Sequence, residues 1–294
     1  MLNHDIADLS ASVEFYDLSQ NIKELDEAGL TIVPQSKLGL PDEWFDRIRD
    51  AILRVANERT GVLFDLNRNP NATFNGRPDE IGHIILSHLI HEDQAFERVA
   101  TNPVKRVLMN HLLGEDHRLA VSDGWIKWET PSSWQGEETT GFHADQSMVP
   151  CPWNWKLPHI ANMNWTLTDY TKEDGALAFV PGSHKEGRTP ELGEALPLAV
   201  PVEAPKGSLV VFSGCLWHGS YRKTTPGLRV TMLGQHCRPY ILPFQDYKNR
   251  IEEKVFTNSE DPEYLRSLTR VNERGMWTEA VSIKERVAGV GAID

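Results

Sequence analysis

The first part of the chain shows the spacing of amphipathic helices. Residues 41–61 place apolar side chains at near-helical intervals from Trp44 to Val55, which predicts a helix with one apolar face. Pro41 suits the first position of this helix, and Gly61 suits its end. Similar patterns predict a short helix, a turn at Gly29 and an extended segment within residues 21–34, and two helices at 92–101 and 103–114.

After residue 118 the pattern changes to short β-rich runs separated by glycine, proline and charged turns. Eight such runs fall within about 120 residues, a number typical of a double-sheet jelly roll. They lie at residues 119–129, 139–146, 159–170, 175–184, 196–204, 207–214, 215–220 and 228–237. From about residue 245 the pattern indicates helix and loop again.

These elements predict a mainly β fold with flanking helices. Its core, at about residues 119–240, is expected to be a double-stranded β-helix of the jelly-roll, cupin-like kind, covered by an N-terminal helical layer. The sequence contains no internal repeat and no flexible linker. We therefore expect a single domain that spans residues 1–294.

Composition excludes some classes of partner. The net charge is −12, and no cluster of lysine and arginine is present to contact nucleic-acid phosphates. No apolar run is long enough to span a bilayer, and the acidic N-terminus lacks the pattern of a signal peptide. The three cysteines show no CxxC spacing, so we expect a cytoplasmic protein that binds neither nucleic acid nor membrane. No pattern indicates an oligomeric state.

The stretch "FHADQ", residues 142–146, contains candidate metal ligands. On a strand, residues two apart point to the same face, so His143 and Asp145 can both face the barrel interior. An imidazole and a carboxylate together suit a divalent metal of intermediate hardness. A His-x-Asp triplet alone is weak evidence, because most such triplets are structural or exposed.

A third ligand candidate lies downstream. His218, in "FSGCLWHGSYRK", falls on a late β run of the same predicted barrel. Two histidines and one carboxylate form the facial triad of non-haem Fe(II) oxygenases. Arg229 lies on the next predicted strand, where its guanidinium suits a dicarboxylate. Ser220 shares a face with His218 and can add a hydroxyl to the same carboxylate.

Residues 22–245 resemble the phytanoyl-CoA dioxygenase family of Fe(II)- and 2-oxoglutarate-dependent oxygenases. The resemblance rests on the order and spacing of several short stretches. These are "LDEAGLTIVP", "NPVKRVLMNHLLG", the His-x-Asp pair, "NWTLTD", "EDGALAFVPGSHK", "KGSLVVFSGCLWHGS" and Arg229.

The resemblance implies particular roles for these residues. It implies that iron is bound by His143, Asp145 and His218. It also implies that Arg229 and Ser220 hold the distal carboxylate of 2-oxoglutarate, with Trp165 beside the cosubstrate. Enzymes of this kind consume O2 and convert 2-oxoglutarate to succinate and CO2 while they oxidise a second substrate.

Four further residues are weaker candidates. Thr140 and Lys127 fall on predicted strands near the metal, where Thr140 is assigned to the cosubstrate and Lys127 to the substrate; either can equally face solvent. Trp153 and Trp155 lie in a proline-rich loop, which makes them candidates for the substrate pocket or a lid. The alternative for the tryptophans of this region in general is packing in the barrel core.

The function predicted from these residues is oxidation, most simply hydroxylation, of a small and largely apolar organic molecule such as a natural-product intermediate. Three alternatives stay open. They are an acyl-CoA hydroxylase of the same family, a 2-oxoglutarate-independent metal enzyme of the cupin kind, and a jelly-roll binding protein without catalytic activity. The complete triad together with Arg229 argues against the last alternative.

Overall fold

The computed structural model describes residues 9–71, 82–132 and 138–270. Its α-helices are α1 (Leu9–Phe15), α2 (Ser19–Ala28), α3 (Asp42–Thr60), α4 (Gln94–Ala100), α5 (Pro103–Leu113), α6 (Tyr247–Arg250), α7 (Glu253–Thr257) and α8 (Pro262–Leu268). Short 3-10 helices are η1 (Gln35–Lys37), η2 (Asp145–Met148), η3 (Ser183–Glu186) and η4 (Leu196–Leu198). In the described part of the chain, no helix is both long and apolar enough to cross a membrane.

The predicted helices are confirmed, and their ends follow the expected chemistry. The helix α3 begins one residue after Pro41 and ends before Gly61, which adopts a left-handed conformation. Asn102 caps α5, since its side chain accepts a hydrogen bond from the backbone of Lys105. The helix α2 ends at Gly29, whose positive φ of 84° turns the chain directly into the first strand.

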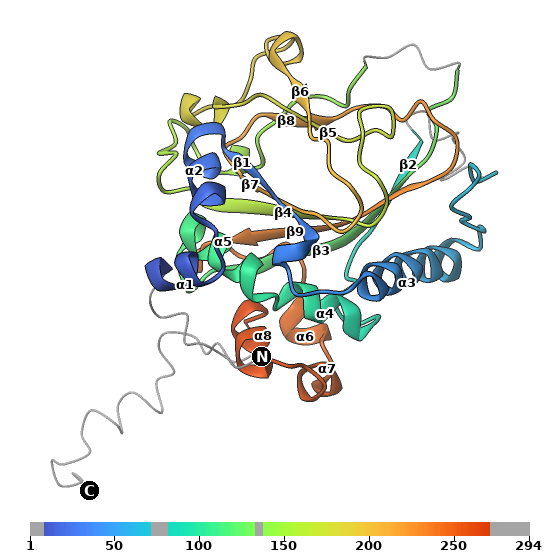
Figure 1. The fold of residues 1–294 in the computed structure, drawn as a ribbon, viewed down its shortest axis with the longest axis horizontal. Helices are drawn as coiled ribbons and strands as arrows, with labels where there is room; N and C mark the ends of the chain where they lie inside the picture. Colours follow the sequence, from blue (N-terminus) through green and yellow to red (C-terminus); the bar gives the residue numbers. More distant parts are fainter. Residues whose placement is uncertain (1–8, 72–81, 133–137, 271–294) are drawn as a thin grey trace, which may run out of the picture.

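Nine strands form two antiparallel sheets in the described residues (Figure 1). The strands are β1 (Leu30–Val33), β2 (His83–Leu86), β3 (Arg118–Lys127), β4 (Ile160–Thr166), β5 (Leu177–Phe179), β6 (Val200–Pro201), β7 (Leu209–Ser213), β8 (His218–Ser220) and β9 (Arg229–Cys237). The major sheet has the order β1-β7-β4-β9-β3-β2, and the minor sheet has the order β6-β5-β8. The two sheets make the jelly-roll core that the sequence predicts.

One predicted strand is wrong. Residues 139–146 form only isolated bridges, at Thr139 and at His143, and Asp145 opens the 3-10 helix η2. The other seven predicted runs each contain a strand. The sequence analysis also missed β2, which pairs with β3 at the edge of the major sheet.

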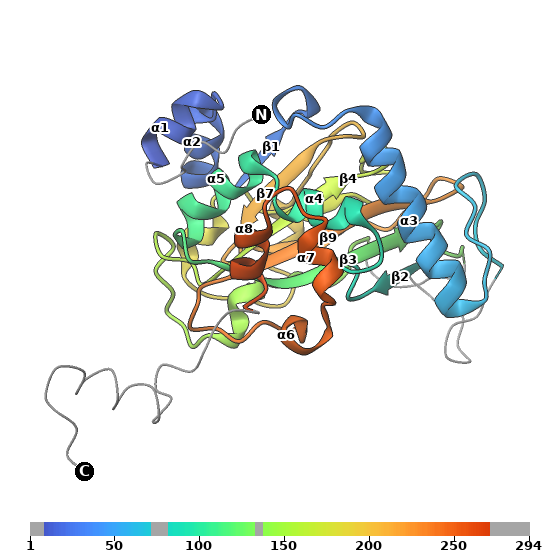
Figure 2. The same ribbon diagram turned by 90° about the horizontal axis from the view of Figure 1, so that it is seen from below.

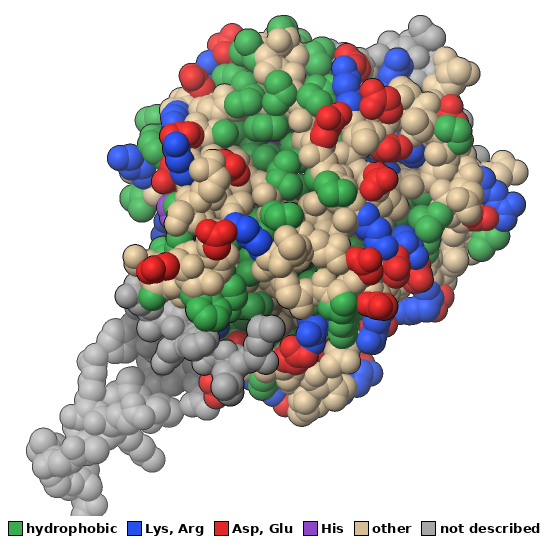
Figure 3. Space-filling view, viewed as in Figure 1, with side chains coloured by type: hydrophobic (Ala, Val, Ile, Leu, Met, Phe, Trp, Pro, Cys, Tyr) green, Lys and Arg blue, Asp and Glu red, His purple; other side chains and the backbone are tan. Residues whose placement is uncertain are grey.

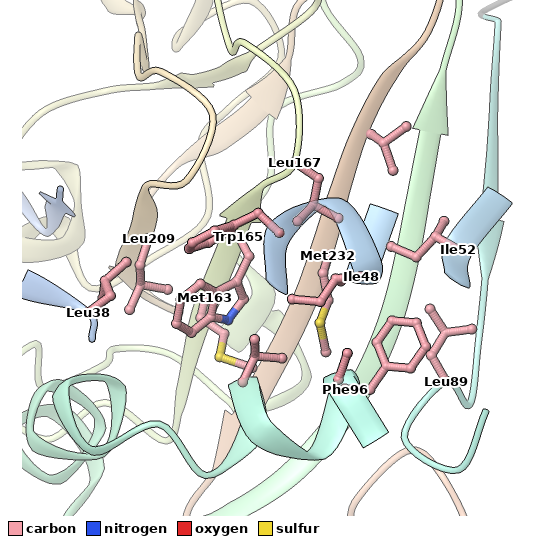
Figure 4. Packing of buried hydrophobic residues seen from close by; sticks show 14 of the residues in the cluster. Leu38, Ile48, Ile52, Leu89, Phe96, Met163, Trp165, Leu167, Leu209 and Met232 are labelled. Atoms are coloured by element: carbon pink, nitrogen blue, oxygen red, sulfur yellow. The ribbon is translucent and has the colours of Figure 1, made fainter. Parts of the chain in front are cut away.

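Helices cover one face of the major sheet (Figure 2). Alternate residues of the strands point toward these helices, as the two-residue period of a strand requires. Trp165 and Met232, register partners on β4 and β9, pack with Ile48 of α3 and Phe96 of α4 in the largest core cluster (Figure 4). Burial of such large apolar side chains stabilises the packing of the helical layer against the barrel.

The opposite face of the major sheet looks toward the minor sheet. On β7, Val210 and Phe212 belong to a second cluster that also contains Leu177 of β5. Their neighbours Leu209 and Val211 belong to the helix-side cluster instead. Major-sheet residues in register with Phe212, such as Asn162, therefore face the interior between the sheets.

Charged side chains are mixed on the molecular surface. On the visible face, lysine and arginine are interspersed with aspartate and glutamate (Figure 3). Some ion pairs of the described residues are local, such as the contact between Arg188 and Glu194 at 2.7 Å, and others join distant parts of the chain, such as Lys206 and Asp46 at 2.5 Å.

Candidate metal centre

The structure brings the three predicted ligands together. His143 and His218 form an isolated antiparallel bridge, in which the backbone N–H of each donates to the carbonyl of the other, at 3.0 and 2.9 Å. Asp145 lies beside both rings, with its oxygens 3.4 Å from His143 Nε2 and 3.5 Å from His218 Nε2. One ligand atom from each residue lies within 4.8 Å of the others.

The ligands reach this arrangement without a shared strand. Ala144 is extended, and the chain then turns into η2 at Asp145. Gln146 fixes the turn, because its backbone N–H donates to Gly214 O at 3.0 Å and its side-chain oxygen accepts from the His159 N–H at 2.7 Å. Ala144 packs away from the ligands in a small apolar cluster that includes Trp153.

Backbone carbonyls determine which nitrogen of each histidine ring carries a hydrogen. His143 Nδ1 lies 3.1 Å from Gly141 O, and His218 Nδ1 lies 3.0 Å from Leu216 O. A carbonyl only accepts hydrogen bonds, so each Nδ1 carries a hydrogen, and Nε2 is the nitrogen of each ring that is left to bind a metal ion. Metal-binding histidines are oriented in this way. The three residues therefore fit a divalent metal ion, and no second such group is found in the described residues.

Burial and mutual charge shape the protonation of the three ligands. A hydrogen bond to Asp145 raises the pKa of His143 against the effect of burial. Burial lowers the pKa of His218. Burial alone would raise the pKa of Asp145, but the charges of both histidines and the polar side chains of His143 and Asn162 beside it outweigh burial and lower the pKa. The centre thus favours an ionised carboxylate, as a metal ligand requires.

Two buried cations lie side by side elsewhere in the barrel. Lys127 on β3 and Arg229 on β9 are register partners, and each is 1% exposed. The Lys127 ammonium donates to Ser220 Oγ at 2.6 Å and also to the carbonyl of Tyr221. The Arg229 guanidinium donates to Gly175 O at 2.9 Å, and Ser220 Oγ donates to the same carbonyl at 3.1 Å.

These two cations form a candidate anion-binding site. No acidic side chain of the described residues lies within ion-pair distance of Lys127 or Arg229, and burial lowers the pKa of both groups. Arg229 lies over the rings of Trp125 and Tyr170, at 5.2 and 5.1 Å, while its Nε has no hydrogen-bond partner. A buried charge without a counter-charge is unfavourable, so the pair suits an anionic ligand.

The remaining candidate residues differ in whether they lie near the cation pair. Thr140 lies beside Ser220, because its hydroxyl accepts the Ser220 backbone N–H at 2.9 Å. Trp165 is not brought to this region: it lies on the helix-facing side of β4 and packs against Phe45, with ring centroids 6.3 Å apart. Trp153 is buried and donates to Val149 O at 2.7 Å.

Trp155 is half-buried and packs against His184 and two lysines. Its ring meets His184 edge to face, with centroids 5.4 Å apart, and lies between the ammonium groups of Lys156 and Lys185. The structure therefore gives Trp155 a packing role among these side chains and does not place it beside the three ligands.

The sequence analysis missed three inward polar residues. Trp125 Nε1 and Asn164 Oδ1 are buried without a hydrogen-bond partner. Asn162 lies next to Asp145 and lowers its pKa. The two asparagines could have been selected from the sequence, because polar amides are unusual inside a mostly apolar β run such as residues 160–166.

Fold and site together define a class of protein. Two histidines and one carboxylate on a jelly-roll barrel are the ligand set of non-haem iron oxygenases. The chain belongs to the phytanoyl-CoA dioxygenase (PhyH) family, whose model matches residues 25–231. The membership expected from the sequence is confirmed.

Curated relatives agree with this membership. The chain is 31% identical over 233 residues to "Dioxygenase olcK" of Penicillium canescens, a match covering 73% of this chain and 70% of that protein. It is 32% identical over 168 residues to "Dioxygenase af480" of Aspergillus fumigatus, covering 55% of this chain and 51% of that protein. The chain thus matches about half the length of the second relative.

Solved structures show the same fold. HygX from Streptomyces hygroscopicus, with nickel and 2-oxoglutarate bound, has a TM-score of 0.59 at 15% identity, covering 77% of this chain and 89% of HygX. EctD from S. alaskensis, with bound Fe, has a TM-score of 0.56 at 17% identity, covering 80% and 78% of the two chains. The predicted jelly-roll fold with flanking helices is confirmed.

Proposed function

We propose that this protein is an Fe(II)- and 2-oxoglutarate-dependent dioxygenase that hydroxylates a small, largely apolar organic molecule and releases succinate and CO2. His143, Asp145 and His218 hold the iron. Arg229 holds the distal carboxylate of 2-oxoglutarate, and Ser220, Thr140 and Lys127 complete that subsite. Bound iron supplies the activation of O2 that is coupled to decarboxylation of the cosubstrate.

One observation carries this proposal. The same barrel contains a three-residue metal-ligand group and, separately, a buried pair of cations without a carboxylate partner. A metal-binding protein without a cosubstrate has no use for the second feature, since two buried cations weaken the fold unless an anion binds. A dicarboxylate supplies that anion and can reach the metal with its other end.

The residues of the chain have distinct tasks in the reaction. The guanidinium of Arg229 offers a planar fork that fixes the direction of a carboxylate, whereas the Lys127 ammonium adds charge. Trp125 and Tyr170 cover the guanidinium and keep water from it. Exclusion of water strengthens the ion pair with the cosubstrate.

Exposed apolar side chains support an apolar substrate, and related proteins support a small molecule. Met148 and Leu157, in the segment between Asp145 and β4, are 48% and 55% exposed, so an apolar ligand gains contacts there. The relatives named above are dioxygenases. A solved neighbour, HygX, has been crystallised with nickel, 2-oxoglutarate and hygromycin B bound, which makes a small molecule the natural class to test.

A substrate screen tests this proposal. The purified protein with Fe(II), O2 and 2-oxoglutarate is exposed to terpenoid, polyketide and acyl-CoA pools, and succinate and product masses are measured. We expect substrate-dependent succinate and a product heavier by one oxygen atom. Turnover confined to acyl-CoA would support the alternative substrate class, whereas failure to bind 2-oxoglutarate in the presence of metal would refute the proposal.

A further inference from the structure

Two amide side chains lie next to each other inside the barrel. Asn162 of β4 and Gln235 of β9 are register partners, and Asn162 is 4% exposed. Gln235 Nε2 donates to Asn162 Oδ1 at 3.1 Å. Neither residue belongs to the ligand group or to the buried cation pair.

This hydrogen bond sets the direction of the Asn162 amide. Because Oδ1 accepts from Gln235, Nδ2 points the other way, and among the described residues it is buried without a hydrogen-bond partner. The amide faces the metal centre, because Asn162 is also the register partner of Phe212, whose ring centroid lies 5.0 Å from that of His218. A buried N–H without a partner is unfavourable, and the Asp145 carboxylate, 3.5 Å from His218 Nε2 in the same centre, can accept its hydrogen bond.

We propose that Asn162, oriented by Gln235, is a positioning residue for Asp145. Its Nδ2 donates to the carboxylate and stops it from rotating away from the Nε2 atoms of the two histidines. This inference rests on the proposed metal centre. Groups that hydrogen-bond to metal ligands in this way hold the ligand geometry that the metal needs.

An amide is the side chain that this position requires. It offers an acceptor to Gln235 and a donor to Asp145 at the same time. An aspartate at position 162 would place a second negative charge beside Asp145, and a leucine would fill the space without a donor. Gln235 is needed because, without its N–H, nothing prevents the amide of Asn162 from turning over.

Three variants separate positioning from simple loss of stability. Asn162→Leu keeps the size and removes the donor. Gln235→Glu replaces the donor by a carboxylate, which attracts the Asn162 NH2 group and leaves its oxygen facing Asp145. Asn21→Leu is the matched control, because Asn21 is a buried asparagine whose Nδ2 donates to Thr31 Oγ1 at 2.9 Å in another part of the molecule.

The readouts are the dissociation constant of Co(II), measured by calorimetry, and the visible spectrum of the Co(II) protein. We expect Asn162→Leu and Gln235→Glu to weaken Co(II) binding by about 10–100-fold and to change the spectrum. Asn21→Leu should lower only the unfolding midpoint. If Asn162→Leu does not fold, Gln235→Glu alone tests the positioning role. Gln235 is only partly buried, so we expect this variant to fold.

Each outcome has one meaning. Variants that bind Co(II) as the parent does, with the parental spectrum, overturn the positioning role while the metal centre stands. A parent protein that does not bind Co(II) overturns the proposed metal centre, and this inference with it.

Discussion

At the scale of single residues, the metal centre depends on what stands behind each ligand. The carbonyls of Gly141 and Leu216 hold the imidazole rings of His143 and His218. These contacts come from backbone atoms, so a motif of side chains cannot predict them. They exist only once the extended segment before η2 has paired with β8.

Removal of a ligand gives the first prediction. His218→Ala should weaken Co(II) binding at least about 100-fold, more than the loss of a group behind a ligand, and abolish succinate formation. His159→Ala is the control, because His159 contacts Tyr240 at 2.8 Å and is not a member of the ligand group. Calorimetry with both variants checks this, and equal affinities in the two would contradict the ligand assignment.

Removal of the guanidinium gives the second prediction. Hydrogen bonds to charged groups contribute about 1.5–3 kcal/mol each, so Arg229→Ala should raise the KM for 2-oxoglutarate at least about tenfold. The affinity for Co(II) should stay the same, because Arg229 is not a ligand. Arg222→Ala, an exposed arginine nearby in the sequence, is the control, and a parental KM in Arg229→Ala would exclude the cosubstrate role.

The residue scale also shows a limit of sequence reasoning. The metal ligands and Arg229 could be selected from the sequence, because their types and order are distinctive. The face occupied by Trp165 was missed, although Met163 and Trp165 alternate with Asn162 and Asn164 along β4, which puts Trp165 on the apolar side of the strand. Because every residue of β4 is buried, only the polar character of the asparagines distinguishes its inner face from the face under the helices.

At the scale of elements, helices and most strands followed from their patterns, whereas the segment 139–146 did not. It is rich in the residue types of strands, but its partners reach it only at Thr139 and His143. Isolated bridges depend on distant residues such as Tyr221, which local sequence does not reveal.

The turn between α2 and β1 gives the third prediction. A Cβ on Gly29, at φ +84°, would lie 2.6 Å from His184 Nδ1 and 2.9 Å from Leu216 Cδ1. A Cβ on Gly61, at φ +71°, would meet nothing within 4 Å. Backbone strain should therefore cost each alanine variant about 1–3 kcal/mol, and overpacking should cost Gly29→Ala about 1–3 kcal/mol more.

Urea unfolding of the two glycine variants measures this difference. Gly61→Ala measures the cost of backbone strain alone. The additional loss of unfolding free energy in Gly29→Ala therefore measures the close approach of the end of α2 to His184 and Leu216. Equal free energies of unfolding would show that the His184 ring moves aside without cost.

At the scale of the whole molecule, buried titratable groups link stability to pH. His117 is fully buried, with Nε2 2.9 Å from Tyr264 OH and Nδ1 3.0 Å from Gly114 O. Burial lowers its pKa from 6.5 to about 3. The folded state therefore holds a neutral ring while the unfolded state takes up a proton below about pH 6.5.

The fourth prediction follows from that difference. The contribution of His117 is complete above its unfolded pKa of 6.5 and is lost as the pH falls from there toward about 3. The free energy of unfolding should decrease between neutral pH and about pH 5, and less so in His117→Gln. Urea unfolding at both pH values measures the slopes, and identical slopes in parent and variant would contradict the assignment.

Glu97 supplies the opposite control. Burial raises its pKa from 4.5 to about 7, so the folded state binds the extra proton. Its contribution to stability therefore grows as the pH falls from about 7 to 4.5. Glu97→Gln should make the acid-induced decrease steeper than in the parent.

The fifth prediction concerns domain organisation. We propose that the chain folds as one domain, because the largest core cluster joins residues of α3 and α5 to residues of β4 and β9. Thermal unfolding should then show one transition that coincides in far-ultraviolet circular dichroism and tryptophan fluorescence. Two separated transitions would show that the helical layer and the barrel unfold independently.

The complete burial of β4 has a consequence for the diversification of this enzyme. A substitution on its inner face disturbs the metal centre, and one on its outer face disturbs the core under the helices. We therefore expect changes in substrate choice to arise in the flanking segment 147–158, where residues such as Met148 and Leu157 are exposed. Laboratory evolution that randomises this segment and leaves β4 intact should return far more folded variants than the reverse library.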